Sequence, residues 1–230
     1  MKKGHLREFL GLFFPDSCVG CKGGLAMGED LLCTRCVEGL PYLDYGRHPR
    51  NPLSRRLVAV MEFNHTVALL KFQPGGLVQH LLHALKYGNQ PEVGQRMGQL
   101  LGEKLQTDGL SGHFDLIIPV PLFHARERMR GYNQSRVFAE GLSETLQVPV
   151  GESVVERHRR TITQTRYARA ERWKNMREAF RVARPSEIEG RNILMVDDVI
   201  TTGATIEACS AALLPFRPGA ISAACIADVP

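Results

Sequence analysis

The chain has 230 residues, of which 43% are hydrophobic and 23% are charged. These proportions are ordinary for a globular protein, and the length allows one moderate domain with a small appendage. The net charge of +5 is compatible with anionic partners but does not demand them. No apolar stretch is long enough to span a bilayer, so we do not expect an integral membrane protein.

The first residues superficially resemble a secretion signal. Met1-Lys2-Lys3 precedes the apolar run 9–14, but that run is short, charged residues interrupt the approach to it, and no small-residue cleavage site follows. The apolar side chains of this segment fall on one face of a helix. We therefore expect a short helix that docks on its own domain, and a cytoplasmic protein.

Four cysteines form two closely spaced pairs in the pattern C-x2-C-x11-C-x2-C, namely Cys18, Cys21, Cys33 and Cys36. Such pairs chelate one tetrahedral ion, and zinc is the default because a closed four-thiolate site suits it. Disulfides or free thiols are the alternative, and a reducing compartment disfavours disulfides. We predict a structural Zn²⁺ site that lets this segment fold without a core of its own.

The next stretch is interpreted as a linker, a hairpin and two helices. Residues 39–56 are rich in Pro, Gly, Arg and Tyr, which is typical of a linker. Two strands, Arg56–Phe63 and Thr66–Phe72, are expected to form a hairpin. Apolar periodicity then predicts the helices Leu77–Tyr87 and Val93–Leu105. We place the domain boundary after residue 50, with the helix, cysteine module and linker in 1–50 and the main domain in 51–230.

A second apolar strand, Asp115–Pro121, is followed by a basic loop, 122–131. The loop contains Arg126 and Arg128, and basic side chains at the end of a parallel strand are suited to hold a pyrophosphate. A solvated loop is the alternative reading. A helix is expected after it, running to Leu146.

The most basic segment is 157–181, with eight arginines and one lysine against two glutamates, and with three aromatic residues interleaved. Arginines among aromatics suit a surface that tracks phosphates and stacks bases. They suit equally a mobile lid over a pyrophosphate, or a plain solvated helix face. The candidate contacts are Arg166, Arg169, Arg172 and Lys174.

The central feature is the stretch 193–205. Four apolar residues predict a strand buried on both faces, the carboxylates Asp197 and Asp198 follow it, and the run Thr201, Thr202, Gly203, Ala204 and Thr205 opens a helix. Ligands of open parallel sheets bind outside the carboxyl ends of the strands. Backbone N–H groups at a helix start cradle anions. Two acids beside such a cradle suit a sugar phosphate.

An acidic strand end also occurs in nucleotide-binding folds, but neither a G-x-x-x-x-G-K-[ST] loop nor a G-x-G-x-x-G fingerprint is present. The Asp-Asp-x-x-Thr-Thr-Gly-x-Thr pattern instead resembles the signature of type I phosphoribosyltransferases, whose ligand is 5-phosphoribosyl 1-pyrophosphate (PRPP). Together with the cysteine pairs and Arg130-Gly131-Tyr132-Asn133-Gln134-Ser135, it resembles the ComF family, with the related GntX proteins. The segments Leu85-Lys86-Tyr87 and Ile118-Pro119-Val120-Pro121 contribute to the match, which covers nearly the full length.

The resemblance implies an α/β protein with a type I phosphoribosyltransferase fold, a central parallel sheet flanked by helices, and an N-terminal four-cysteine zinc finger. It implies that Asp197 and Asp198 accept hydrogen bonds from the ribose hydroxyls and that residues 201–205 wrap the 5-phosphate. It further implies that the loop with Arg126 and Arg128 meets the pyrophosphate, with Mg²⁺ bridging pyrophosphate and ribose oxygens. By the same resemblance we expect a protein linked to natural transformation, which acts on incoming single-stranded DNA at the inner face of the membrane.

Two functional hypotheses remain open. The first is an enzyme, a Mg²⁺-dependent phosphoribosyltransferase or hydrolase with an unknown acceptor. The second is a non-catalytic, PRPP-sensing module that binds single-stranded DNA and competence proteins during uptake. The intact acid pair motivates the first hypothesis and the arginine-rich segment the second, and both can hold together.

Overall fold

The core of the molecule is a parallel β-sheet. The computed structural model describes residues 17–58, 61–158 and 179–229. Its main sheet has four strands in the order β1-β6-β5-β2, and all neighbours are parallel. The strands are β1 (Thr66–Lys71), β2 (Leu116–Pro119), β5 (Asn192–Ile200) and β6 (Ala220–Asp228). The predicted central parallel sheet is confirmed.

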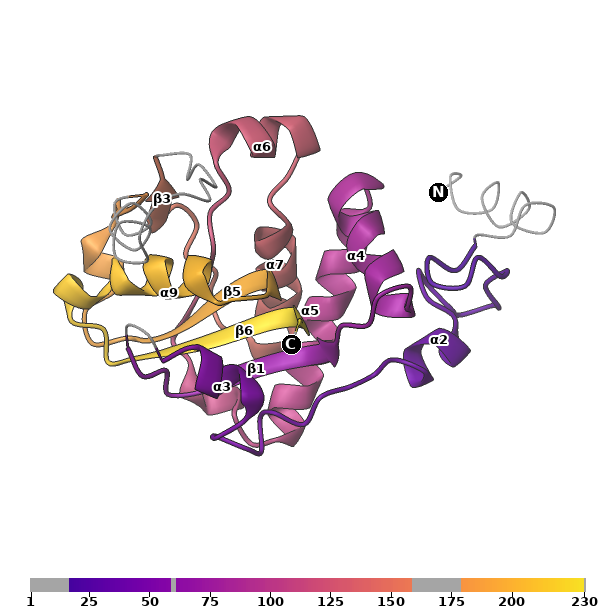
Figure 1. Cartoon of the computed structure of the whole chain (residues 1–230), viewed down its shortest axis with the longest axis horizontal. Helices are drawn as coiled ribbons and strands as arrows, with labels where there is room; N and C mark the ends of the chain where they lie inside the picture. Colours follow the sequence, from indigo (N-terminus) through magenta and orange to yellow (C-terminus); the bar gives the residue numbers. More distant parts are fainter. Residues whose placement is uncertain (1–16, 59–60, 159–178, 230) are drawn as a thin grey trace, which may run out of the picture.

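Helices cover both faces of this sheet (Figure 1). One hydrophobic cluster joins alternate residues of β5 to α4, α5 and α7, and a second cluster joins the other residues of β5 to α3 and α9. These helices are α3 (Pro52–Arg56), α4 (Leu77–Tyr87), α5 (Pro91–Thr107), α7 (Gln134–Leu146) and α9 (Ala204–Ala211). The smaller elements are α2 (Thr34–Glu38), α6 (His124–Arg130), η1 (Ser111–His113), η2 (Pro185–Glu187), η3 (Leu214–Phe216), β3 (Val155–Arg157) and β4 (Phe180–Val182).

Strand β5 is longer than its apolar run. The run was expected to end before the two aspartates, but β5 continues to Ile200, and Asp197 and Ile200 stay in register with Cys225 and Asp228 of β6. Successive side chains of a strand point to opposite faces. Asp198 therefore lies on the face of α4, and Asp197 on the face of α9.

Helices α5 and α7 pack with their backbones in contact. A Cβ atom on Gly98 would collide with the backbone oxygen of Phe138, and one on Gly141 would collide with that of Gln95. Only glycine permits such an approach. This close pair covers one face of the sheet and fixes the start of α7, which the candidate site uses.

The expected hairpin is wrong. Strand β1 pairs in parallel with β6, which follows it by about two thirds of the chain, and no strand occurs in the described part of 56–63. The other edge of β1 is covered by the supposed linker, since the Leu43 N–H donates to the Leu69 carbonyl at 2.9 Å. Part of that linker also folds into α3, whose first turn is capped by the Asn51 side chain.

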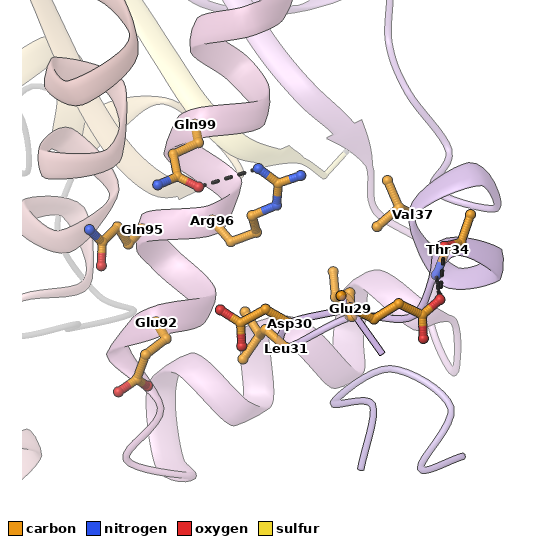
Figure 2. Close-up of a pocket in the computed structure, with 11 residues that line it drawn as sticks. Glu29, Asp30, Leu31, Thr34, Val37, Glu92, Gln95, Arg96 and Gln99 are labelled. Carbon is orange, nitrogen blue, oxygen red and sulfur yellow. Dashed lines mark hydrogen bonds between the residues drawn. The ribbon is translucent and has the colours of Figure 1, made fainter. Parts of the chain in front are cut away.

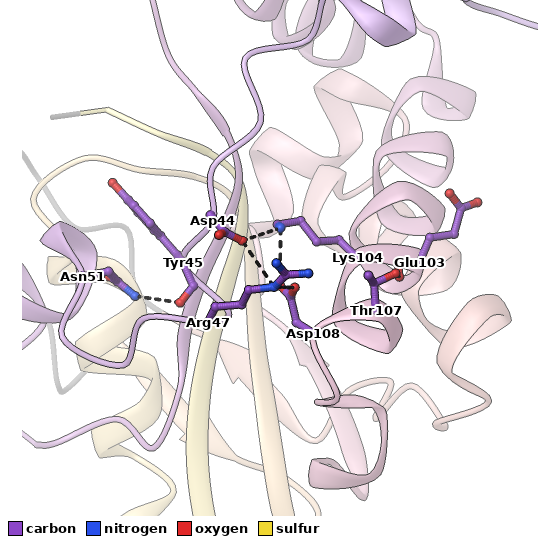
Figure 3. Close-up of polar contacts among 8 residues, drawn as sticks. All are labelled: Asp44, Tyr45, Arg47, Asn51, Glu103, Lys104, Thr107 and Asp108. Carbon is purple, nitrogen blue, oxygen red and sulfur yellow. Dashed lines mark hydrogen bonds and ion pairs between the residues drawn. The ribbon is translucent and has the colours of Figure 1, made fainter.

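A polar cluster fastens the linker to the end of α5 (Figure 3). The Asp108 carboxylate has no exposed surface, and the Arg47 Nε donates to it at 2.8 Å. The Lys104 Nζ lies 2.9 Å from an Asp44 oxygen and 3.4 Å from an Asp108 oxygen. Because a buried carboxylate needs its cations, this cluster holds the linker in one position.

The expected loop 122–131 is instead helix α6, which ends at Gly131 in the left-handed conformation. Only the two ends of the arginine-rich segment 157–181 lie in the described structure. Its first residue belongs to β3 and its last two to β4, and these two strands pair with each other. Four candidate contacts, Arg166, Arg169, Arg172 and Lys174, and the expected N-terminal helix lie outside the described residues. None of the described helices has the length and apolar character needed to cross a membrane.

Candidate functional site

The two aspartates lie at the carboxyl edge of the sheet, and each is held by a different helix. The Ser135 hydroxyl donates to Asp197 Oδ1 at 2.8 Å, and the Asp198 N–H donates to the same oxygen at 2.9 Å. The Lys86 Nζ lies 3.0 Å from Asp198 Oδ2. Within the described structure, Asp197 Oδ2 and Asp198 Oδ1 have no hydrogen-bond donor, so each carboxylate keeps one oxygen for a ligand.

The environment of Asp197 favours its neutral form. Burial raises the pKa of Asp197 to about 7, and the neighbouring charge of Asp198 adds to the increase. The Ser135 hydrogen bond and the positive charge of Lys86 oppose it. Asp197 is thus poised to change its protonation near neutral pH.

The loop 201–205, which we predict to surround a phosphate, turns sharply into α9. Gly203 has φ +80°, a conformation that side-chain-bearing residues rarely adopt, and a Cβ there would also collide with Leu57, the residue that follows α3. Thr201 and Thr202 are exposed. Asp197 and residues 199–206 line a small hollow at this turn. The loop is therefore open, with its hydroxyl groups beside the aspartates.

The supposed linker also reaches this edge. Asp228, at the end of β6, is buried and forms an ion pair with Arg56 of α3. The Tyr45 hydroxyl donates to the other Asp228 oxygen at 3.0 Å. These contacts hold α3, and with it Leu57, against the loop at Gly203.

Basic residues approach the site from α6 and β3. Arg126 and Arg128 are exposed on α6. Burial lowers the pKa of the Arg157 guanidinium, as does the charge of Arg126, while Asp197 opposes the change. Arg157 is thus electrostatically linked both to α6 and to the acid pair, which brings positive charge to the same edge.

The four cysteines come together as the spacing predicts. Their sulfur atoms all lie within 4.8 Å of one another, and the Cys21 and Cys33 sulfurs are 3.8 Å apart. Zn–S bonds of about 2.3 Å in a tetrahedron would place the sulfurs about 3.8 Å apart, whereas a disulfide requires about 2 Å. The cluster could therefore hold a zinc ion.

The cysteine module has no core separate from the main domain. Cys18, Cys36 and Leu32 are buried in the same hydrophobic cluster as Leu81 of α4. Burial alone would raise the pKa of the Cys18 thiol, but hydrogen bonds from the Cys21, Cys33 and Gly20 backbone, with one from the Cys36 side chain, lower it to about 6. A thiol that ionises readily is suited to bind a metal.

A cavity of about 570 Å³ lies between the cysteine module and the first half of α5. Figure 2 shows Arg96 extending from α5 towards the module, with Asp30 on the other side. Glu29, which also lines the cavity, accepts hydrogen bonds at 2.7 Å from the N–H groups of Ala26 and Thr34. The Glu29 carboxylate thus stabilises the turn of the cysteine module. The cavity lies at the interface between the module and the main domain.

Three residues that contact or face the acid pair, Lys86, Ser135 and Arg157, were not predicted from the sequence to belong to the site. Lys86 and Ser135 lie in segments that supported the family resemblance, yet their contacts with the aspartates come from other elements of the fold. Arg157 was counted only as part of the arginine-rich segment. No spacing along the chain links these residues to Asp197 and Asp198, because α4, α7 and β3 are all far from β5 in sequence.

A parallel sheet with an acid pair and an open small-residue loop at its carboxyl edge defines a phosphoribosyltransferase fold. Consistent with this class, the family model described as the phosphoribosyl transferase domain matches residues 83–230. The chain belongs to this family.

Individual proteins that resemble the chain show which members of this family it is similar to. The chain is 28% identical over 218 residues to competence protein F of Haemophilus influenzae, covering 86% of this chain and 90% of the relative. It is 29% identical over 231 residues to the DNA utilization protein YhgH of Escherichia coli K12, covering 94% and 98%. Competence protein ComFC of Bacillus subtilis is 32% identical over 102 residues, covering 44% and 39%. The resemblance to the ComF family is confirmed.

Two solved structures show weaker likeness. The glutamine PRPP amidotransferase of Bacillus subtilis, complexed with ADP and GMP, aligns with a TM-score of 0.43 at 20% identity, covering 62% of this chain and 30% of the other. A hypoxanthine phosphoribosyltransferase of Staphylococcus aureus aligns with a TM-score of 0.38 at 16% identity, covering 61% and 65%. The fold assignment depends on the sheet and the family match.

We predict that Asp197→Asn stabilises the ligand-free protein at alkaline pH. The folded pKa of about 7 exceeds the usual 3.8, so the folded chain holds the proton more tightly. The contribution of the Asp197 carboxyl to the free energy of unfolding is therefore greatest below its unfolded pKa and is lost as the pH rises through 7. Asparagine keeps an acceptor for Ser135 without the charge. Thermal unfolding should give the variant a higher Tm at pH 8, by about 2–4 °C per kcal/mol.

The advantage of the variant should shrink as the pH is lowered to about 5. Asp115→Asn is the matched control, because that carboxylate is exposed at the opposite edge of the sheet. A Tm difference for Asp197→Asn that is the same at both pH values would contradict the prediction.

Proposed function

We propose that the protein binds PRPP with Mg²⁺ at the carboxyl edge of the sheet and transfers or hydrolyses its phosphoribosyl group. The observation that carries this proposal is the acid pair beside the open loop 201–205, where one carboxylate oxygen of each aspartate has no donor among the described residues. A ligand with neighbouring hydroxyls and a phosphate matches both parts. The family match supports the same ligand class.

In this proposal Asp197 and Asp198 accept hydrogen bonds from the ribose 2′ and 3′ hydroxyls. The backbone N–H groups and hydroxyls of residues 201–205 surround the 5-phosphate, aided by the positive end of α9. Gly203 lets the chain turn closely enough for this contact. Ionised aspartates can accept hydrogen bonds from both ribose hydroxyls, so binding should strengthen as the pair loses its proton.

Displacement at the anomeric carbon passes through a state with positive charge on the sugar, which the neighbouring carboxylates stabilise. Arg126 and Arg128 of α6, with Arg157 behind them, attract the departing pyrophosphate. Mg²⁺, when bound with PRPP, neutralises part of the pyrophosphate charge. The acceptor is a nitrogen nucleophile or water.

The proposal predicts that PRPP binds in a Mg²⁺-dependent manner and that Asp197→Asn/Asp198→Asn weakens binding at least about tenfold, equivalent to roughly 1.4 kcal/mol. Calorimetry with and without Mg²⁺ measures this directly. Release of pyrophosphate from PRPP, abolished in the same variant, would establish catalysis. Equal binding by wild type and the double variant would overturn the proposed site.

Asp115→Asn serves again as the control, since it changes a carboxylate at the opposite edge of the sheet. Binding without pyrophosphate release, in the presence of candidate nucleophiles, would favour a PRPP-sensing protein over an enzyme.

We further propose that the four cysteines bind one structural Zn²⁺ and that residues 1–50 act as a metal module on a main domain of 51–230. The sulfur separations fit a tetrahedral ion. Metal analysis should return about one zinc per chain for wild type and none for Cys33→Ser/Cys36→Ser. Retention of zinc by that variant, or a disulfide in the reduced protein, would contradict the assignment.

A second function is favoured by the relatives' names, competence protein F and DNA utilization protein, and by exposed arginines on α6. In this proposal the protein takes part in natural transformation in the cytoplasm. It binds incoming single-stranded DNA and competence proteins at the inner membrane. Arg126 and Arg128 join Arg166, Arg169, Arg172 and Lys174 in holding the phosphates, and the PRPP site then serves as a sensor.

Binding of single-stranded DNA should weaken steeply with salt because phosphate contacts release counterions. Each arginine contact that is lost should lower the slope of log affinity against log salt by about 0.7. The slopes of wild type and Arg166→Glu/Arg169→Glu/Arg172→Glu, measured by fluorescence anisotropy, test this. Arg184→Glu/Arg217→Glu is the control, because those arginines pair with surface glutamates elsewhere. A flat salt response would exclude the function.

A further inference from the structure

The acid pair is held by two side chains for which the proposed function assigns no task. The Lys86 Nζ lies 3.0 Å from Asp198 Oδ2, and the side chains are 24% and 13% exposed. The Ser135 hydroxyl donates to Asp197 at 2.8 Å. Lys86 comes from the last turn of α4 and Ser135 from the first turn of α7, so two helices converge on neighbouring residues of β5.

Lys86 is anchored by its neighbours in the chain. The Tyr132 hydroxyl donates to the Leu85 carbonyl at 2.5 Å, one of the carbonyls that a helix end leaves without a partner. The Leu85 side chain is fully buried, and the Arg130 guanidinium lies over the Tyr87 ring, 5.5 Å from its centre. The residues on both sides of Lys86 are thus fixed, which directs the lysine to Asp198.

The segment before α7 is anchored in turn. The Asn133 side chain donates to the Val120 carbonyl at 3.1 Å and accepts from the Ser135 N–H at 3.0 Å. It therefore ties the start of α7 to the end of β2. The same short segment, 132–135, positions Ser135 directly and Lys86 through Leu85.

Lys86 differs from the other charged groups around the acid pair in its distance from the carboxylates. The titratable groups that face Asp197 are Asp198 beside it, Lys86 from α4, Arg157 from β3, Cys209 from α9 and Cys225 from β6. Among the described residues, Lys86 is the cation within ion-pair distance of either carboxylate. Two adjacent carboxylates without such a cation repel each other, and one of them takes up a proton.

We propose that Lys86 is a positioning residue of the proposed PRPP site, a built-in cation that favours ionisation of the acid pair and orients Asp198, while Ser135 orients Asp197. Lys86 occupies one oxygen of Asp198 and leaves the other for a ligand hydroxyl. The ligand's identity depends on the proposed function, whereas the effect of Lys86 on the aspartates does not.

The first test needs no ligand. Carboxyl ¹³C signals of Asp197 and Asp198, assigned with the asparagine variants, are followed against pH in wild type, Lys86→Met and Lys86→Arg. Removal of the cation should raise the apparent midpoint of the pair by about one pH unit or more. Arginine, which restores the charge, should bring it back towards wild type. A purely structural role for the side chain would not produce this rescue.

Lys71→Met is the matched control. Lys71 is an exposed lysine at the carboxyl end of β1, on the same edge of the sheet, and it has no ion pair in the described structure. Its removal should leave the midpoint unchanged. A folded Lys86→Met protein, judged by its Tm, whose midpoint equals that of wild type would overturn the proposal.

The second test measures PRPP affinity against pH. Lys86→Met should bind about tenfold more weakly than wild type near pH 7, the equivalent of one pKa unit, and should recover at higher pH. The two failures are distinguishable. If wild type binds no PRPP, the proposed function fails and the carboxyl titration still decides the role of Lys86. If wild type binds and Lys86→Met binds equally at every pH, the proposal for Lys86 fails alone.

Discussion

The repulsion between two neighbouring carboxylates is the constraint around which this structure is arranged. Asp197 and Asp198 stand side by side on a strand that is otherwise buried, where a charge is costly without partners. Each aspartate meets a different helix end at this edge of the sheet: the first turn of α7 provides a hydroxyl for Asp197 and the last turn of α4 a cation for Asp198. The parallel sheet matters because it brings both helix ends to the edge where the small-residue loop begins.

The cysteine module is connected to this edge through α4. A Cβ on Gly20 would overlap the side chain of Leu77, at the start of the helix, and the buried cysteines share a hydrophobic cluster with Leu81 and Leu85. The last turn of the same helix carries Lys86. The cysteine module thus supports the helix that holds Asp198. This gives a physical reason for joining a cysteine cluster to a domain whose chemistry does not need it.

Several elements were predictable because their signals are local. The apolar run 193–196, the periodicity of α4 and the cysteine spacing each mark one element within a few residues. The hairpin prediction failed because the apolar strand 66–71 has no mark for its partner, which follows it by about 150 residues. Helix α6 was missed because its sequence, His124–Arg130, has no buried residue and hence no apolar face. The segment 39–56 was taken for a linker because polar and turn-forming residues dominate it.

The sequence by itself determined the family, the parallel-sheet class, the acid pair with its loop, and the set of four cysteines. Each of these is written in consecutive or closely spaced residues. Only the tertiary structure decided which side chains surround the acids: Lys86, Ser135 and Arg157 come from three elements that are distant along the chain. Contacts of this kind arise from the packing of helix ends against strand ends, and no periodicity or spacing records them.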